Sequence, residues 1–242
     1  MKKAIIIAAI VTAVAVICTV LSLRGWPGSL VGSGNLATEE YAFADFTEVE
    51  ISSAFEFEIE QSSSYNISIT ADDNVMEYVQ VSQDGPTLKI GLRRFTWFGP
   101  VTLRASVTMS QLNGLTVSGA SRGTVSDFSS TEDLDITVSG ASRVTGDITA
   151  GNVEFEISGA STIQLEGSAN DMVADVSGAS SLNLDDFTVN NADVDFSGAS
   201  SGTINLSGRL DADLSGASRL WYIGEPTMGT IDTSGASTIS KK

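Results

Sequence analysis

The sequence contains no histidine, a single cysteine and only four prolines among its 242 residues. Without histidine, a Ser-His-Asp triad, imidazole acid–base catalysis and most zinc sites are excluded. The single cysteine, Cys18, lies near the N-terminus, so the rest of the chain forms neither an internal disulfide nor a thiolate metal site. These absences remove much of the usual catalytic chemistry, and we expect a protein that is not an enzyme and has no cofactor.

Basic residues are also scarce, because 13 lysines and arginines stand against 30 aspartates and glutamates, giving a net charge of −17. Every acidic residue lies beyond Arg24, so the part of the chain after that position is more acidic still. A strongly negative surface repels nucleic acid and anionic headgroups. We therefore expect no nucleic-acid partner, and cations or basic groups as the natural counterparts.

Charges are absent from residues 4–23, which follow Lys2 and Lys3. Twenty helical residues at about 1.5 Å each can cross a bilayer core of about 30 Å. The lysine pair predicts a cytoplasmic N-terminus with the remainder outside. We predict a signal anchor over residues 1–24, which makes a single-pass cell-membrane protein with an extracytoplasmic C-terminal part; cleavage of a signal peptide there would secrete it instead. Residues 25–40, rich in glycine and serine, are predicted to be a flexible stalk.

Residues 41–112 alternate apolar and polar positions, as in Val49, Ile51, Phe55, Phe57 and Ile59. This period of two is typical of strands with one buried face. The Asp-Gly-Pro triplet at residues 84–86 indicates a tight turn between two strands. The segment is predicted to be an N-terminal β region.

Residues 113–242 contain a repeat. The tetrapeptide Ser-Gly-Ala-Ser (SGAS) occurs seven times at intervals of 18 to 21 residues. A period near 19 is too short for a helix pair and suits one coil of a parallel β-solenoid. We therefore predict an all-β fold, a parallel β-helix of about 19-residue coils joined to the N-terminal β region and preceded by the N-terminal transmembrane or signal helix.

The residues around each tetrapeptide predict the register of the coil. Positions one, three and five before it are mostly apolar, as in Ile157, Phe155 and Val153, and a second short apolar strand follows it. The tetrapeptide is therefore predicted to be the corner between two strands. Its glycine can adopt a positive φ without steric cost, which makes these residues structural corners: Gly119, Gly140, Gly159, Gly178, Gly198, Gly216 and Gly235.

Three features of the chain stand out together: the opening FTEVEISSAFEFEIEQ at residues 46–61, the DGPTLKIGL segment at residues 84–92 and the recurrent SGAS corners. With these features the chain resembles the bacterial head-GIN domain family of auto-transporter adhesins. The resemblance covers roughly residues 41–240. It implies a parallel β-helix joined to an N-terminal β region on the outside of the cell, and it supplies no catalytic residues.

The most unusual local composition places aromatic residues beside arginines in a predicted hairpin tip. Such a group could stack on sugar rings or rest at a membrane interface, while the alternative is that the aromatics cover one end of the solenoid core. These residues are a candidate ligand contact: Arg93, Arg94, Phe95, Trp97 and Phe98.

An acidic residue stands two positions before the tetrapeptide in five successive coils. Stacked coils are about 4.8 Å apart, so the carboxylates form a column on the outward face. The column is either a solvated charged surface or a set of oxygen ligands for Ca²⁺ or a basic partner. The candidate metal ligands are Glu156, Asp175, Asp195, Asp213 and Asp232.

Together these patterns predict an extracytoplasmic surface or envelope protein that presents an acidic solenoid for adhesion, ligand binding or structural display. The expected partner is a surface glycan or protein, with the membrane contacted through the N-terminal segment. Two alternatives remain open. One is a polysaccharide hydrolase or lyase that uses paired carboxylates, and the other is the ectodomain of an envelope signalling complex.

Overall fold

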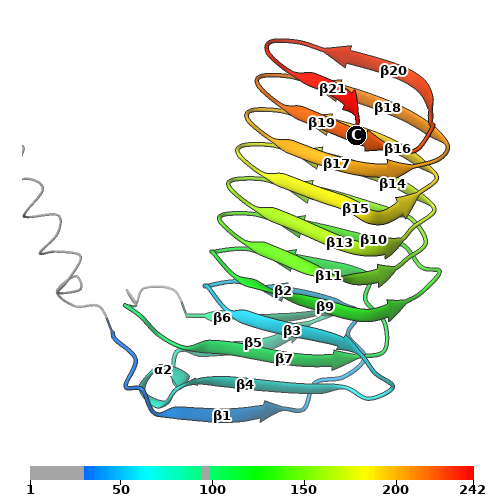
Figure 1. Ribbon diagram of the computed structural model, residues 1–242. Coiled ribbons are helices and arrows are strands. Elements are labelled where there is room, and N and C mark those ends of the chain that lie inside the picture. The colour runs from blue at the N-terminus through cyan, green and yellow to red at the C-terminus, as the bar shows by residue number, and fades with distance from the viewer. Residues whose placement is uncertain (1–29, 94–98) are drawn as a thin grey trace, which may run out of the picture.

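The computed structural model describes residues 30–93 and 99–242, which form a parallel β-solenoid of two facing sheets (Figure 1). One helix, α2 (Asp73–Met76), accompanies the strands. The eleven-stranded sheet contains, in spatial order, β1 (Leu36–Tyr41), β4 (Asn66–Asp72), β7 (Leu103–Met109), β3 (Glu56–Gln61), β9 (Arg122–Ser129), β11 (Arg143–Thr149), β13 (Thr162–Ser168), β15 (Ser181–Val189), β17 (Ser201–Leu206), β19 (Arg219–Ile223) and β21 (Thr238–Lys241).

The ten-stranded sheet lies opposite and supplies the second strand of each coil. It contains, in spatial order, β20 (Thr227–Thr233), β18 (Arg209–Leu214), β16 (Asn191–Phe196), β14 (Asp171–Val176), β12 (Val153–Ile157), β10 (Leu134–Val138), β8 (Gly114–Val117), β2 (Glu48–Ile51), β6 (Thr87–Leu92) and β5 (Val79–Asp84). From β8 onward the chain alternates between the two sheets, and each strand pairs in parallel with the strand one coil away. The predicted all-β parallel solenoid is confirmed, and it has about seven coils.

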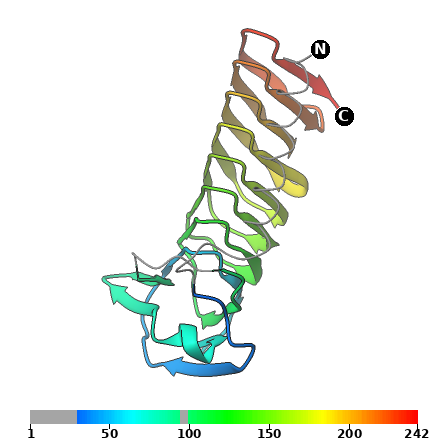
Figure 2. The same ribbon diagram turned by 90° about the vertical axis from the view of Figure 1, so that its left-hand side faces the viewer.

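The core lies between the two sheets and follows the predicted alternation. In β12, Val153, Phe155 and Ile157 are buried while Glu154 and Glu156 are exposed. The register stacks apolar positions of successive coils on one another, so that Phe155 lies between Ile136 and Ala174 of the neighbouring coils. Burial of one apolar side chain stabilises the fold by about 1.5–3 kcal/mol. The repetition of this contact from coil to coil explains the straight stack seen in Figure 2.

The corner glycines all have a left-handed backbone, with φ between 68° and 78°. From the third corner onward a chain of hydrogen bonds links the stack, because the alanine N–H of each corner donates to the glycine carbonyl of the corner before it, as in Ala160 to Gly140 at 2.8 Å. The final serine of the tetrapeptide is buried in six coils: Ser121, Ser142, Ser161, Ser180, Ser200 and Ser218. Small residues at these positions let successive corners approach closely.

A second ladder, not predicted from the sequence, lies at the opposite corner, where the chain enters the ten-stranded sheet. Asp133 Oδ1 accepts from the Asn152 backbone N–H at 2.8 Å, and Asp171 Oδ1 accepts from the Asn191 backbone N–H at 3.1 Å. Asn191 Oδ1 in turn accepts from the Arg209 N–H at 2.8 Å. These side chains satisfy backbone donors that the turn leaves without a partner.

The N-terminal part continues the solenoid out of sequence order. Strands β2 and β3 form a coil directly beneath β8 and β9, and β6 and β7 form the next coil below. The turn at Gly85-Pro86 joins β5 and β6 as the antiparallel hairpin that the sequence predicted. The corner between β2 and β3 contains Ser53 and Ala54, with φ of 69° and 64°, in place of the glycine and alanine of the repeat. It is a corner of the same kind that sequence analysis missed, because no glycine marks it.

The stalk predicted over residues 25–40 is wrong where the structure describes it. Residues 36–41 form β1, which pairs antiparallel with β4. The preceding residues are held by Asp72, whose buried carboxylate accepts backbone N–H groups of Gly34 at 2.8 Å and Thr102 at 2.7 Å. Glycine and serine here allow close approach, since a Cβ on Gly32 would lie 2.3 Å from the Asp72 carboxylate.

The predicted N-terminal membrane or signal helix lies in residues 1–24, outside the described residues. Within residues 30–93 and 99–242 no helix is long and apolar enough to cross a membrane.

Candidate functional site

The outer face of the ten-stranded sheet, hereafter the acidic face, contains the carboxylate column that the sequence predicted. The pairing registers place Glu156 beside Asp175, Asp175 beside Asp195, and Asp213 between Asp195 and Asp232. Neighbouring rungs are about 4.8 Å apart, which makes like charges repel by about 1 kcal/mol in water before screening. The column is therefore a real concentration of negative charge.

A second acidic column on the same face is interrupted. Asp135 and Glu154 stack in register, the next rung holds Val173, and Asp193 and Asp211 follow. The side chain of Val173 is 52% exposed, a break in an otherwise charged row.

The surroundings of two carboxylates on this face shift their pKa values in opposite directions. Burial, together with the charges of Asp175, Asp213 and Asp193, raises the pKa of Asp195. By contrast, the hydrogen bond from the Arg209 guanidinium and that from the Thr230 N–H lower the pKa of Asp211 to about 2. Negative charge is thus neutralised at the Asp211 end and left unpaired in the middle of the first column.

The acidic face does not gather its carboxylates into a cluster. Among the described residues no group of three or more acidic side chains is placed to hold one metal ion. The column extends along the solenoid axis, one carboxylate per coil, so any bridging cation would contact adjacent rungs in pairs. Calcium binding by Glu156, Asp175, Asp195, Asp213 and Asp232 stays a prediction.

The outer face of the eleven-stranded sheet, hereafter the polar face, differs in composition although its strands alternate in the same way. One column has hydroxyl and amide side chains from coil to coil: Thr124, Thr145, Gln164, Asn183 and Thr203. The neighbouring column begins with Arg104, Glu56, Arg122 and Arg143 on successive strands. Basic side chains of the solenoid thus gather near the N-terminal end of this face.

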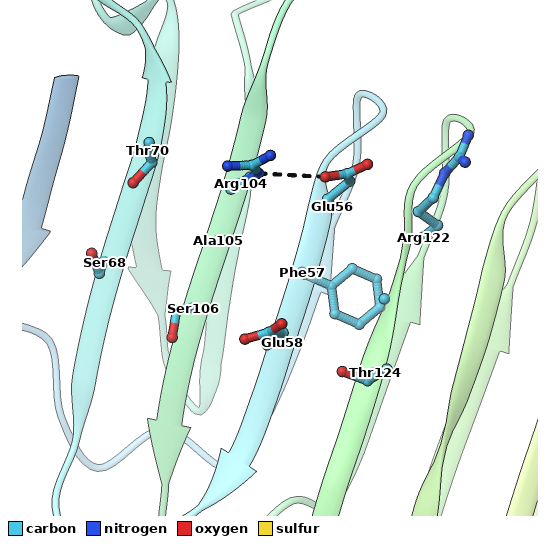
Figure 3. Close-up of a pocket in the computed structure, with 11 residues that line it drawn as sticks. Glu56, Phe57, Glu58, Ser68, Thr70, Arg104, Ala105, Ser106, Arg122 and Thr124 are labelled. Atoms are coloured by element: carbon cyan, nitrogen blue, oxygen red, sulfur yellow. Dashed lines mark hydrogen bonds and ion pairs between the residues drawn. The ribbon is translucent and has the colours of Figure 1, made fainter. Parts of the chain in front are cut away.

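A groove of about 410 Å³ lies on the polar face at the junction of the repeat with the N-terminal part (Figure 3). Strands β4, β7, β3 and β9 supply its lining. Arg104 and Glu56 point toward one another across the groove and form an ion pair, with Nε to Oε2 at 3.5 Å. The remaining polar lining consists of four hydroxyls, one carboxylate and one guanidinium: Ser68, Thr70, Ser106, Thr124, Glu58 and Arg122.

The floor of the groove depends on a glycine. A Cβ on Gly123 would lie 2.1 Å from the Phe57 carbonyl oxygen and 2.4 Å from the Phe57 ring. The ring therefore occupies the space that the inward side chains of later coils fill, for example Val144 in β11. Sequence analysis did not predict the groove. The groove is formed by strands from residues 56 to 124 that neighbour one another in the sheet in a different order from their order along the chain.

The predicted aromatic ligand contact lies between β6 and β7. These two strands belong to different sheets, so they do not pair with each other as a hairpin. Arg93 is exposed and its N–H donates to the Tyr78 carbonyl at 2.9 Å. Arg94, Phe95, Trp97 and Phe98 lie outside the described residues, so ligand contact by this group stays a prediction.

Fold and surface together define a parallel β-solenoid with a packed interior, whose distinctive chemistry lies on two outer faces of opposite character. A family model described as "Putative auto-transporter adhesin, head GIN domain" matches residues 45–226, so the chain belongs to that family. The family resemblance noted in the sequence is thereby confirmed. No curated protein matches the chain at a significant level.

Solved structures share the fold. A "putative adhesin" from Bacteroides fragilis NCTC 9343 has a TM-score of 0.84 at 21% identity, covering 88% of this chain and 100% of that chain. A "putative adhesin" from Parabacteroides merdae ATCC 43184 has a TM-score of 0.68 at 20% identity, covering 89% and 100%. A "putative lipid binding protein" from Parabacteroides distasonis ATCC 8503 has a TM-score of 0.62 at 20% identity, covering 88% and 99%. At these identities the likeness establishes the fold alone.

Proposed function

We propose that the chain is an extracytoplasmic surface protein that binds a ligand on the outside of its solenoid and serves in adhesion. The observation that carries the proposal is the difference between the two outer faces. The interior is filled by apolar side chains from both sheets, which leaves the outward positions to carry recognition. One face is acidic, while the other has hydroxyls, amides, arginines without an ion pair among the described residues, and a groove of about 410 Å³.

The family to which the chain belongs supports an adhesive role, and the apolar segment at residues 4–23 supports attachment outside the cytoplasm. A solenoid suits this task because each coil contacts only its neighbours, so a long surface can be built from one small unit. The binding surface is then held on rigid strands instead of loops.

The enzyme alternative receives no support from the groove. A glycosidase needs a general acid whose proton is retained by a buried setting. Glu56 is instead ion-paired with Arg104, and its side chain is 59% exposed. No feature of the described residues favours the signalling alternative.

A binding screen tests the proposal. Beads coated with the full chain are incubated with arrays of bacterial and host glycans and of surface proteins, which tests binding. In a second experiment, intact cells carrying the chain are labelled with a membrane-impermeant amine reagent, which tests location. We expect saturable binding to at least one array member and labelling of the lysines on intact cells. Absence of all binding, or labelling only after cell lysis, would contradict the proposal.

A further inference from the structure

We propose that the groove and the adjoining arginines of the polar face bind an acidic polysaccharide, with Arg122 and Arg143 contacting the carboxylates of its uronic acid units. This inference rests on the proposed binding function and names the class of ligand. It goes beyond the family assignment because it follows from side chains of this chain alone.

The two arginines stand side by side, and neither has an ion-pair partner in the part of the chain that the structure describes. Arg122 of β9 pairs in register with Arg143 of β11, which places their guanidinium groups on adjacent rungs about 4.8 Å apart. Both are exposed, and neither forms an ion pair with another described residue. Glu56, which is in register with Arg122 on the other side, forms its ion pair with Arg104.

Their surroundings make this arrangement unusual for the chain. Most other described basic side chains contact a carboxylate, as Lys89, Arg209 and Lys242 do. In a protein of net charge −17, two adjacent guanidinium groups left unpaired form a local site of opposite sign. A guanidinium binds a carboxylate through two parallel N–H···O bonds, so a ligand with repeated carboxylates satisfies both.

The groove beside the arginines supplies contacts for sugar hydroxyls. Ser68, Ser106 and Thr124 project into it, and in Figure 3 the Glu58 carboxylate extends toward Ser106. From Thr124 the hydroxyl and amide column continues to Thr145 and Gln164 on the next two strands. A linear chain lying across the strands would therefore meet one hydrogen-bonding side chain on each strand it crosses.

One competing polyanion, single-stranded nucleic acid, is disfavoured by the same geometry. Single-stranded nucleic acid needs exposed aromatic rings on which bases stack, and the one aromatic residue that lines the groove, Phe57, is only 2% exposed. The acidic face repels any polyanion, so an acidic ligand would be directed to the polar face.

The test compares two forms of one polymer. Binding of the full chain to oligogalacturonate is measured by calorimetry beside binding to its methyl-esterified form, which has the same backbone without the carboxylate charges. We expect the esterified form to bind at least about tenfold more weakly, and binding of the acidic form to weaken as NaCl is raised from 50 to 200 mM.

Variants locate the site. Arg122→Gln with Arg143→Gln should raise the Kd at least about tenfold, whereas Arg219→Gln, an exposed arginine in the same column at the far end, should leave it within about twofold. Ser106→Trp should remove binding by filling the groove. All three proteins should keep the melting temperature of the parent, because the substituted side chains are outside the core.

The outcomes separate this inference from the proposed function. Equal affinity for the two polymer forms, or a double variant that binds as the parent does, would overturn the acidic-polysaccharide site. Failure to bind either polymer, while the array screen finds another ligand, would overturn it too and leave adhesion standing. A chain that binds nothing in either experiment would contradict both.

Discussion

The corner between β12 and β13 and the corner between β2 and β3 occupy the same place in their coils, yet only the first contains glycine. Gly159 lies directly above the previous corner, and a Cβ there would lie 2.4 Å from the Gly140 carbonyl oxygen. Ser53 has a similar φ of 69°, but the end of β6 lies beneath it, and its hydroxyl accepts a hydrogen bond from the Leu92 N–H at 3.3 Å.

The comparison shows that the turn alone does not require glycine. A positive φ at a non-glycine residue costs about 1–2 kcal/mol, which the β2–β3 corner sustains. From the third corner onward, what excludes a side chain is the glycine carbonyl of the coil below. The repeat is thus held by close backbone stacking, whereas the N-terminal part is held by particular side chains such as Asp72.

The largest effect is expected from Gly159→Ala. The added Cβ meets a backbone carbonyl that cannot move without disturbing the Ala160 hydrogen bond, so we expect the free energy of unfolding to fall by about 3 kcal/mol or more. Urea denaturation measures it. Gly85→Ala is the matched control, with φ of 58° and no atom within 4 Å of the new Cβ, and should cost about 1 kcal/mol. Equal losses would remove the stacking argument.

Asp72→Asn should produce the next largest effect and a change in pH dependence. The backbone N–H groups of Thr102 and Gly34 lower the pKa of Asp72 below 3.8, so its carboxylate stabilises the fold above that value and loses this contribution as the pH falls through the folded pKa. We expect a lower melting temperature at pH 7 and a shallower fall between pH 5 and 3.

The exposed Asp84 supplies the control for that experiment, since its side chain is 83% exposed beside Lys89. Asp84→Asn should leave the melting curve at pH 7 nearly unchanged. If Asp72→Asn keeps the parent's pH profile, the N-terminal part is not held through that carboxylate.

Ser53→Gly should change stability by less than about 0.5 kcal/mol, because relief of the positive φ is offset by greater freedom of the unfolded chain and by loss of the hydroxyl contact. Chemical denaturation of this variant beside Gly159→Ala sharpens the comparison. A large loss would mean that the Ser53 hydroxyl is essential to the first corner.

The smallest effect is expected on the acidic face. The pKa of Asp195 is raised in the folded protein, so the charged form of this residue destabilises the fold as the pH rises from 3.8 through the folded pKa. The double variant Asp195→Asn with Asp213→Asn should therefore stabilise the protein by about 0.3 kcal/mol at low salt. Thermal melts in CaCl₂ and in NaCl of equal ionic strength test the calcium prediction. The calcium prediction expects a higher melting temperature in CaCl₂ that the double variant abolishes. Equal melting temperatures in the two salts would leave the column as a solvated charged surface.

The strict spacing of SGAS made the repeat predictable. One tetrapeptide per coil, with apolar residues at alternate positions before it, was enough to predict the corner, the buried face and the stacked carboxylates, because each depends on residues close in sequence. The opposite corner was missed because Asp133, Asn152 and Asp171 alternate between two residue types and are recognisable only once their hydrogen bonds are known.

The sequence by itself determined the solenoid, its period and the outward acidic columns, since a period of two along each strand and of about 19 along the chain leaves one way to bury the apolar residues. Only the tertiary structure decided the order of the first coils, the docking of residues 30–41 and the groove. These depend on pairings between distant segments, such as Glu56 with both Arg104 and Arg122. Such pairings are chosen by the packing of the whole core, as when the Phe57 ring fills the space that a side chain at Gly123 would occupy. Local patterns do not encode them.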